Sequence, residues 1–74
     1  MWKDRIVLDP KIMVGKPVIK GTRITVARIV GLIAQGWSNE EILRNYPQLN
    51  KQDIEAALKY AAETLNQEKV YPLT

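Results

Sequence analysis

The chain has 74 residues and a formal net charge of +3, and it contains neither cysteine nor histidine. This length allows a single domain, residues 1–74, and leaves no room for a separate catalytic domain. Without thiolate or imidazole side chains, zinc and iron–sulfur sites and the Cys and His nucleophile systems are nearly excluded. We therefore expect no enzymatic activity, no cofactor and no bound metal.

The apolar runs of the sequence are short. Residues 6–8 are too few for the hydrophobic region of a signal peptide. The longest run, residues 29–34, is far below the roughly 20 residues of a membrane-spanning helix. We expect a cytoplasmic protein with no membrane association. A domain this small, without disulfides, depends on close packing or on a partner subunit, so we also expect a homodimer or a higher homo-oligomer.

The charges are unevenly distributed along the chain. Residues 1–28 hold seven lysines and arginines against two aspartates, whereas residues 29–74 hold four such cations against six acidic residues. An anionic partner would therefore prefer the N-terminal half.

Short β-branched runs alternate with turn residues in the segment 5–25, which predicts two or three short strands. The runs are residues 5–8, 18–19 and 22–25. Because glycine tolerates a positive φ, Lys20-Gly21 predicts a tight turn that pairs the second run with the third.

The apolar spacing changes to the helical period at Val26, which predicts a first helix over 26–35. Its apolar positions are Val26, Ile29, Val30, Ile33 and Ala34. Thr25 is a suitable N-cap, and Gly36 suits a left-handed residue at the C-terminal end. Gly31 costs the helix interior roughly 1 kcal/mol relative to alanine, which suggests a close contact with another helix.

A second helix is predicted over 39–45. Ser38 and Glu41 have the spacing of a capping box, and Ile42 then faces the core. Pro47 requires the helix to end just before it, because the residue preceding a proline avoids helical geometry.

The third and longest helix is predicted over 51–66, with Asn50 as its cap and Asp53 three residues later. Its predicted apolar stripe consists of Ile54, Ala57, Leu58, Ala61 and Leu65. Residues 67–74 are predicted to be a tail.

The order of elements is mainly α with short N-terminal β-strands. Two helices joined by the short connection 46–50, with a third helix before them, match a tri-helical helix-turn-helix arrangement. The same order also fits a plain three-helix bundle, which has no chemistry of its own.

If the chain binds DNA, the third helix would enter the major groove. The candidate residues on it are Lys51, Gln52, Glu55 and Lys59. Gln52 suits recognition of adenine, and Lys51 suits guanine or phosphate. Asp53, Glu55 and Glu63 would repel the DNA backbone, so a merely solvated polar face remains an equal alternative.

A second group of candidate DNA-binding residues lies in the strand region. Four cations would neutralise phosphates if they shared one face: Lys16, Lys20, Arg23 and Arg28. The alternative is scattered surface charge.

Three segments of the sequence resemble the DUF433 family. They are Ile6-Val-Leu-Asp-Pro10, Gly15-Lys-Pro-Val-Ile-Lys-Gly-Thr-Arg-Ile24, and Trp37-Ser-Asn-Glu-Glu-Ile-Leu followed by Tyr46-Pro47 and Leu49. The resemblance covers about residues 5–62. It implies a helix-turn-helix domain, often described as winged-helix-like and oligomeric. It also implies an antitoxin that neutralises a PIN-like nuclease and represses their shared operon by binding operator DNA.

The family supplies no agreed set of functional residues. Arg23 is the most informative position in its motif, because a cation beside a fixed turn would either bind phosphate or pair with a carboxylate such as Asp9. We slightly favour the structural role.

Two functions therefore remain in view. The first is the DNA-binding, toxin-neutralising module implied by the family. The second is a protein-interaction module without DNA binding, in which the apolar tail residues Val70, Tyr71 and Leu73 add as a strand to a partner.

Overall fold

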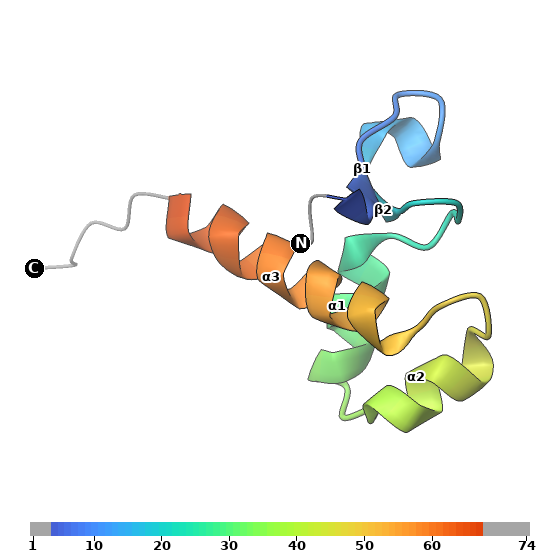
Figure 1. The fold of residues 1–74 in the computed structure, drawn as a ribbon. Helices are drawn as coiled ribbons and strands as arrows, with labels where there is room; N and C mark the ends of the chain where they lie inside the picture. Colours follow the sequence, from blue (N-terminus) through green and yellow to red (C-terminus); the bar gives the residue numbers. More distant parts are fainter. Residues whose placement is uncertain (1–3, 68–74) are drawn as a thin grey trace, which may run out of the picture.

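The computed structural model of the chain describes residues 4–67, without the side chains of Met13 and Gln67. Two short strands and a 3-10 turn come first, and three helices follow (Figure 1). The elements are β1 (Ile6–Val7), η2 (Met13–Gly15), β2 (Val18–Ile19), α1 (Val26–Ala34), α2 (Asn39–Asn45) and α3 (Lys51–Gln67). Each helix begins at the residue where the sequence predicts it.

The sheet is antiparallel, with Ile6 opposite Ile19 and Val7 opposite Val18. A tight turn follows β2, in which the Thr22 amide donates to the Ile19 carbonyl at 3.0 Å and Gly21 has a φ of +80°. The predicted turn at Lys20-Gly21 is therefore confirmed. The third predicted strand is reduced to an isolated bridge between Val18 and Thr25.

Helix α1 begins and ends with the signals that its sequence contains. The Thr25 hydroxyl accepts from the Arg28 amide at 3.0 Å, and Gly36 has a φ of +96° just beyond the last turn. The predicted apolar stripe needs one change, because Leu32 is buried and Ala34 is exposed. The close contact expected at Gly31 is also wrong: among the described residues, no neighbour lies within 4 Å of the position that a Cβ would take there.

Helix α2 starts with a complete capping box. The Glu41 amide donates to the Ser38 hydroxyl at 3.1 Å, and the Ser38 amide donates to the Glu41 carboxylate at 3.2 Å. The box thus satisfies backbone amides that the start of a helix leaves without an internal partner. Ile42 is fully buried one residue later, as predicted.

The core lies where the sheet and the three helices meet. Its largest fully buried side chains are Val18, Ile19, Ile29, Ile42 and Ile54. Helix α1 packs against both α2 and α3, and α3 also packs against β1. Every described element except η2 thus contributes to a single core.

Helix α3 continues beyond this core, with its C-terminal half extending past the other elements (Figure 1). Ile54 and Ala57 are buried, but Leu58 is 40% exposed and Leu65 is 63% exposed. The predicted apolar stripe is therefore only half covered. Helix α1 has 9 residues and α3 has 17, so α1 is too short to shield the far end of its neighbour.

The fold is mainly helical, with a two-stranded antiparallel sheet ahead of three helices, and it is consistent with a small helix-turn-helix-like domain. Within residues 4–67, no helix has the length and apolar character needed to cross a membrane.

Candidate nucleic-acid interface

The connection between α2 and α3 is short and well held. The Tyr46 amide donates to the Ile42 carbonyl at 2.9 Å, and the Leu49 amide donates to the Tyr46 carbonyl at 2.9 Å. Leu49 is buried, which fixes the connection to the core. The two helices therefore have a defined relative orientation, as a helix-turn-helix unit requires.

Reciprocal hydrogen bonds close the start of α3. The Asp53 amide donates to Asn50 Oδ1 at 3.0 Å, and the Asn50 amide donates to Asp53 Oδ2 at 3.0 Å. The predicted cap is confirmed. It fixes the first turn of α3, on which two of the candidate DNA-binding residues lie.

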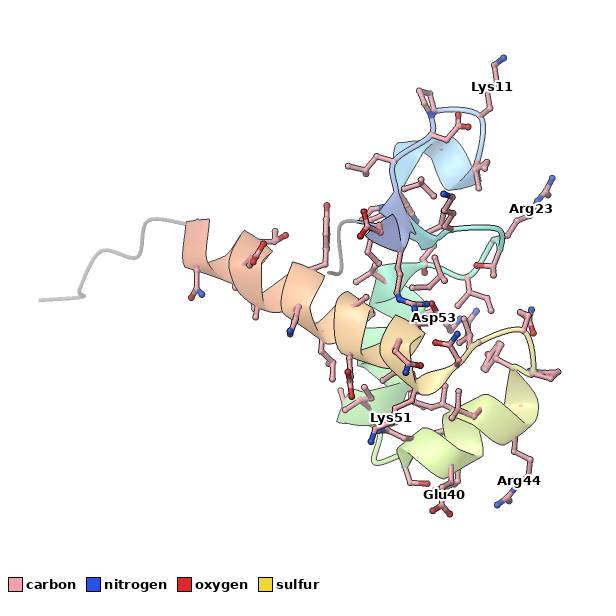
Figure 2. The ribbon with its side chains drawn as sticks, in the orientation of Figure 1. Lys11, Arg23, Glu40, Arg44, Lys51 and Asp53 are labelled. Carbon is pink, nitrogen blue, oxygen red and sulfur yellow. The ribbon has the colours of Figure 1, made fainter. Side chains whose placement is uncertain are left out.

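The four candidates on α3 are all exposed: Lys51, Gln52, Glu55 and Lys59. At 3.6 residues per turn, their positions fall within about 100° of the helix circumference. Figure 2 shows Lys51 at the N-terminal end of the helix. The structure thus brings these residues together on one polar surface, which we call the α3 face.

Asp53 lies on the opposite side of α3 and is nearly buried. Its Oδ1 accepts a hydrogen bond from Arg5 Nη1 at 3.0 Å. In this ion pair the Asp53 side chain is 8% exposed and the Arg5 side chain is 40% exposed. From the sequence, Asp53 was expected to be one of the charges that repel DNA. That expectation is wrong, because the carboxylate points inward and is paired with a cation.

The four cations of the strand region are exposed but divided among different sites. Lys20 lines one hollow together with Asp4, Arg5 and Asp53. Arg23 and Arg28 line another, and Lys16 lines neither of the two. Of the four, the hollows bring together only the two arginines.

Arg23 does not pair with Asp9. The Asp9 carboxylate instead accepts from the Lys11 amide at 2.9 Å, and Arg23 makes no ion pair or side-chain hydrogen bond within residues 4–67. Thr22 fixes the turn, because its hydroxyl donates to the Ile19 carbonyl at 2.8 Å and accepts from the Ile24 amide at 3.0 Å. The structural role favoured for Arg23, as the partner of a carboxylate, is therefore wrong.

Sequence reasoning missed Arg5 and Tyr46. Arg5 carried no signal beyond its charge, and its partner lies 48 residues away. Tyr46 closes α2 and lines the same hollow as the two arginines.

Among the described residues, no group of acidic side chains is arranged to hold a metal ion. The candidate partner-binding residues Val70, Tyr71 and Leu73 lie outside the described range.

The domain has three helices, with a short turn between α2 and α3. The last helix has a closed cap and an exposed polar face. Together these features define a helix-turn-helix-like domain. The chain belongs to the DUF433 family: the family model, described as "Protein of unknown function (DUF433)", matches residues 6–61.

Known proteins from three organisms are similar to the chain. A crystal structure of a DUF433 member from Anabaena variabilis has a TM-score of 0.81 and 34% identity, covering 88% of this chain and 64% of that one. The "Uncharacterized protein y4eO" of Sinorhizobium fredii is 34% identical over 59 residues, which are 80% of this chain and 27% of the relative. An "Uncharacterized protein" of Archaeoglobus fulgidus is 74% identical over 23 residues, 31% of this chain and 64% of the relative. The matched part is less than two thirds of the length of each of these three proteins.

Proposed function

We propose that this chain is a cytoplasmic, antitoxin-type module that binds operator DNA through the α3 face, neutralises a PIN-like partner protein and represses their shared operon. The proposed activity is binding, without catalysis. The observation that carries the DNA-binding part is the exposure of four polar residues on one side of α3, at the end of a helix-turn-helix unit.

The chemistry of the α3 face suits the major groove. Gln52 has the donor and acceptor needed for a bidentate contact with adenine, and Lys51 would reach guanine or a phosphate. Glu55 would accept a hydrogen bond from the amino group of cytosine. The N-terminal residues of a recognition helix make such contacts in known helix-turn-helix proteins, and the first two turns of α3 contain all three residues.

The electrostatics of α3 favour selective binding over nonspecific binding. On the exposed side, Lys51 and Lys59 are accompanied by Glu55 and Glu63, so the side has no net positive charge. The inward turn of Asp53 onto Arg5 removes a further carboxylate from the approach to DNA. Affinity would therefore depend on base contacts and on phosphate contacts made elsewhere.

Repression by a small helix-turn-helix module usually involves two copies on a two-fold symmetric site. A homodimer would bind half-sites about one helical turn of DNA apart. We propose this arrangement for the operator of the chain.

The test is a fluorescence-anisotropy titration with the DNA upstream of the chain's own gene and with a scrambled duplex of equal length, each at low and at physiological salt. The proposal predicts tight binding to the native duplex that persists at physiological salt. Equal, weak binding to both duplexes that disappears with salt would contradict it.

A second candidate function is a protein-interaction module without DNA binding. It is favoured by the exposed leucines of α3, Leu58 and Leu65, because large apolar side chains on one stripe of a helix commonly mark a contact with another protein. We propose that the protein in contact with these two leucines is the PIN-like partner.

This second function is tested by calorimetric titration of the partner encoded beside the chain. Changing both leucines to serine should weaken the complex at least tenfold, whereas Leu8→Ser, at a residue that is 60% exposed in the strand region, should leave it unchanged. Deleting residues 70–74 tests the tail separately. If neither change weakens the complex, the contact lies elsewhere.

A further inference from the structure

A hollow of about 230 Å³ lies where the loop before α1, the first turn of α1 and the end of α2 meet. It is lined by Arg23, Ile24, Thr25, Arg28 and Tyr46. Because these residues come from two separate parts of the chain, the hollow exists only in the folded domain. We call it the arginine hollow.

The lining of the arginine hollow is cationic and rich in donors. Its lining residues include two arginines and one tyrosine but no acidic residue, and the Arg23 side chain extends outward from the loop before α1 (Figure 2). The first turn of α1 has no acidic residue either. Neither Arg23 nor Arg28 makes an ion pair within residues 4–67, in contrast to Arg5, which is paired with Asp53.

The backbone around the hollow is fixed by other bonds. The Val26 amide donates to the Pro17 carbonyl at 2.9 Å, and the Arg28 amide donates to the Thr25 hydroxyl at 3.0 Å. These amides at the start of α1 are therefore occupied. The side chains of the two arginines and Tyr46 then remain as donors for a ligand at the hollow.

We propose that the arginine hollow binds a backbone phosphate of DNA. Guanidinium groups bind phosphate oxygens through paired, charge-assisted hydrogen bonds, and a phenol adds a further donor. The loop before α1 and the connection 46–50 both lie toward the N-terminal end of α3 (Figure 1). DNA read by the first turns of α3 would bring its flanking phosphates to this end.

This inference rests on the proposed function and adds an anchoring contact outside the α3 face. Phosphate contacts set the position of a protein on DNA, whereas base contacts set the sequence preference. The arginine hollow and the α3 face would thus contribute different properties, which separate experiments can resolve.

The first experiment compares two double variants of the full chain in the anisotropy titration. Arg23→Gln/Arg28→Gln removes the proposed contacts. Lys11→Gln/Arg44→Gln removes the same charge from exposed residues at other places on the molecule (Figure 2). Circular dichroism verifies that both variants fold.

The arginine variant should bind native DNA about tenfold more weakly at physiological salt. The slope of log K against log salt should fall by about 0.9 for each phosphate that the variant no longer neutralises, while the preference for native over scrambled DNA is retained. The control variant should show a smaller change in both quantities. Equal behaviour of the two variants would overturn the inference and leave the proposed function intact.

The second experiment detects the site without DNA. Titration of inorganic phosphate into ¹⁵N-labelled chain should shift the side-chain resonances of Arg23 and Arg28 in the wild type. If these shifts occur but no DNA binds, the hollow is a phosphate site. The proposal that this phosphate belongs to DNA is then overturned. If phosphate shifts no resonance there and DNA binding does not depend on the arginines, the inference is wrong.

Discussion

The guanidinium of Arg5 and the carboxylate of Asp53 meet at 3.0 Å, which ties the chain just before β1 to the first turn of α3. The second carboxylate oxygen accepts from the Asn50 amide, so one side chain both caps α3 and joins it to the N-terminal region. The position of the proposed recognition helix therefore depends on a residue distant in sequence.

Removing this guanidinium should destabilise the fold. Arg5→Ala leaves a nearly buried carboxylate without its cation, and we expect a loss of about 1 to 3 kcal/mol in the free energy of unfolding. Lys16→Ala is the control, because Lys16 is exposed and outside the hollow around Asp53. It should change stability by less than about 0.5 kcal/mol. Urea denaturation measures both, and equal stability of the two variants would contradict the assigned role of Arg5.

Two glycines should respond in opposite directions to alanine. Neither Gly21 nor Gly31 has an atom within 4 Å of the position that a Cβ would take, so steric clash is not a factor. Gly21 has a φ of +80°, and alanine there should cost about 1 kcal/mol or slightly more. Gly31 lies inside α1, where alanine should stabilise by about 0.5 to 1 kcal/mol. Thermal unfolding of both variants tests the pair, and a shift of the same sign in each would be inconsistent with these conformations.

The helix starts could be predicted from sequence because their signals are local. Ser38 with Glu41, and Asn50 with Asp53, lie three residues apart and satisfy each other's backbone groups whatever the rest of the chain does. The same applies to the turn at Gly21. The cap at Asn50 also placed the residues of the α3 face, because their positions on the helix surface are counted from the residue where the helix begins.

Features that depend on distant parts of the chain were missed. The inward direction of Asp53 requires knowledge of where Arg5 lies, and the grouping of Arg23 and Arg28 with Tyr46 requires the packing of α1 against α2. Periodicity correctly indicated that Leu65 lies on the apolar stripe of α3. It contained no information on whether any neighbour was long enough to cover that residue.

The half-covered stripe of α3 leads to a stability prediction. Ile54 is fully buried, so Ile54→Ala should cost about 2 to 5 kcal/mol. Leu65 is 63% exposed, and Leu65→Ala should cost less than about 1 kcal/mol in the isolated domain. Chemical denaturation at a low protein concentration measures both. A comparable loss for Leu65→Ala would mean that this residue is covered in solution.

The DNA-binding role of the α3 face is tested most directly by removing polar side chains at the two ends of helix α3. In the anisotropy titration with native and scrambled DNA at physiological salt, Lys51→Ala/Gln52→Ala is compared with Asn66→Ala, which removes an exposed amide near the far end of the same helix. We predict that the double variant loses at least tenfold in preference for native DNA, about 1.4 kcal/mol, and that Asn66→Ala retains it. Equal preference in both variants would contradict recognition through the first turns of α3.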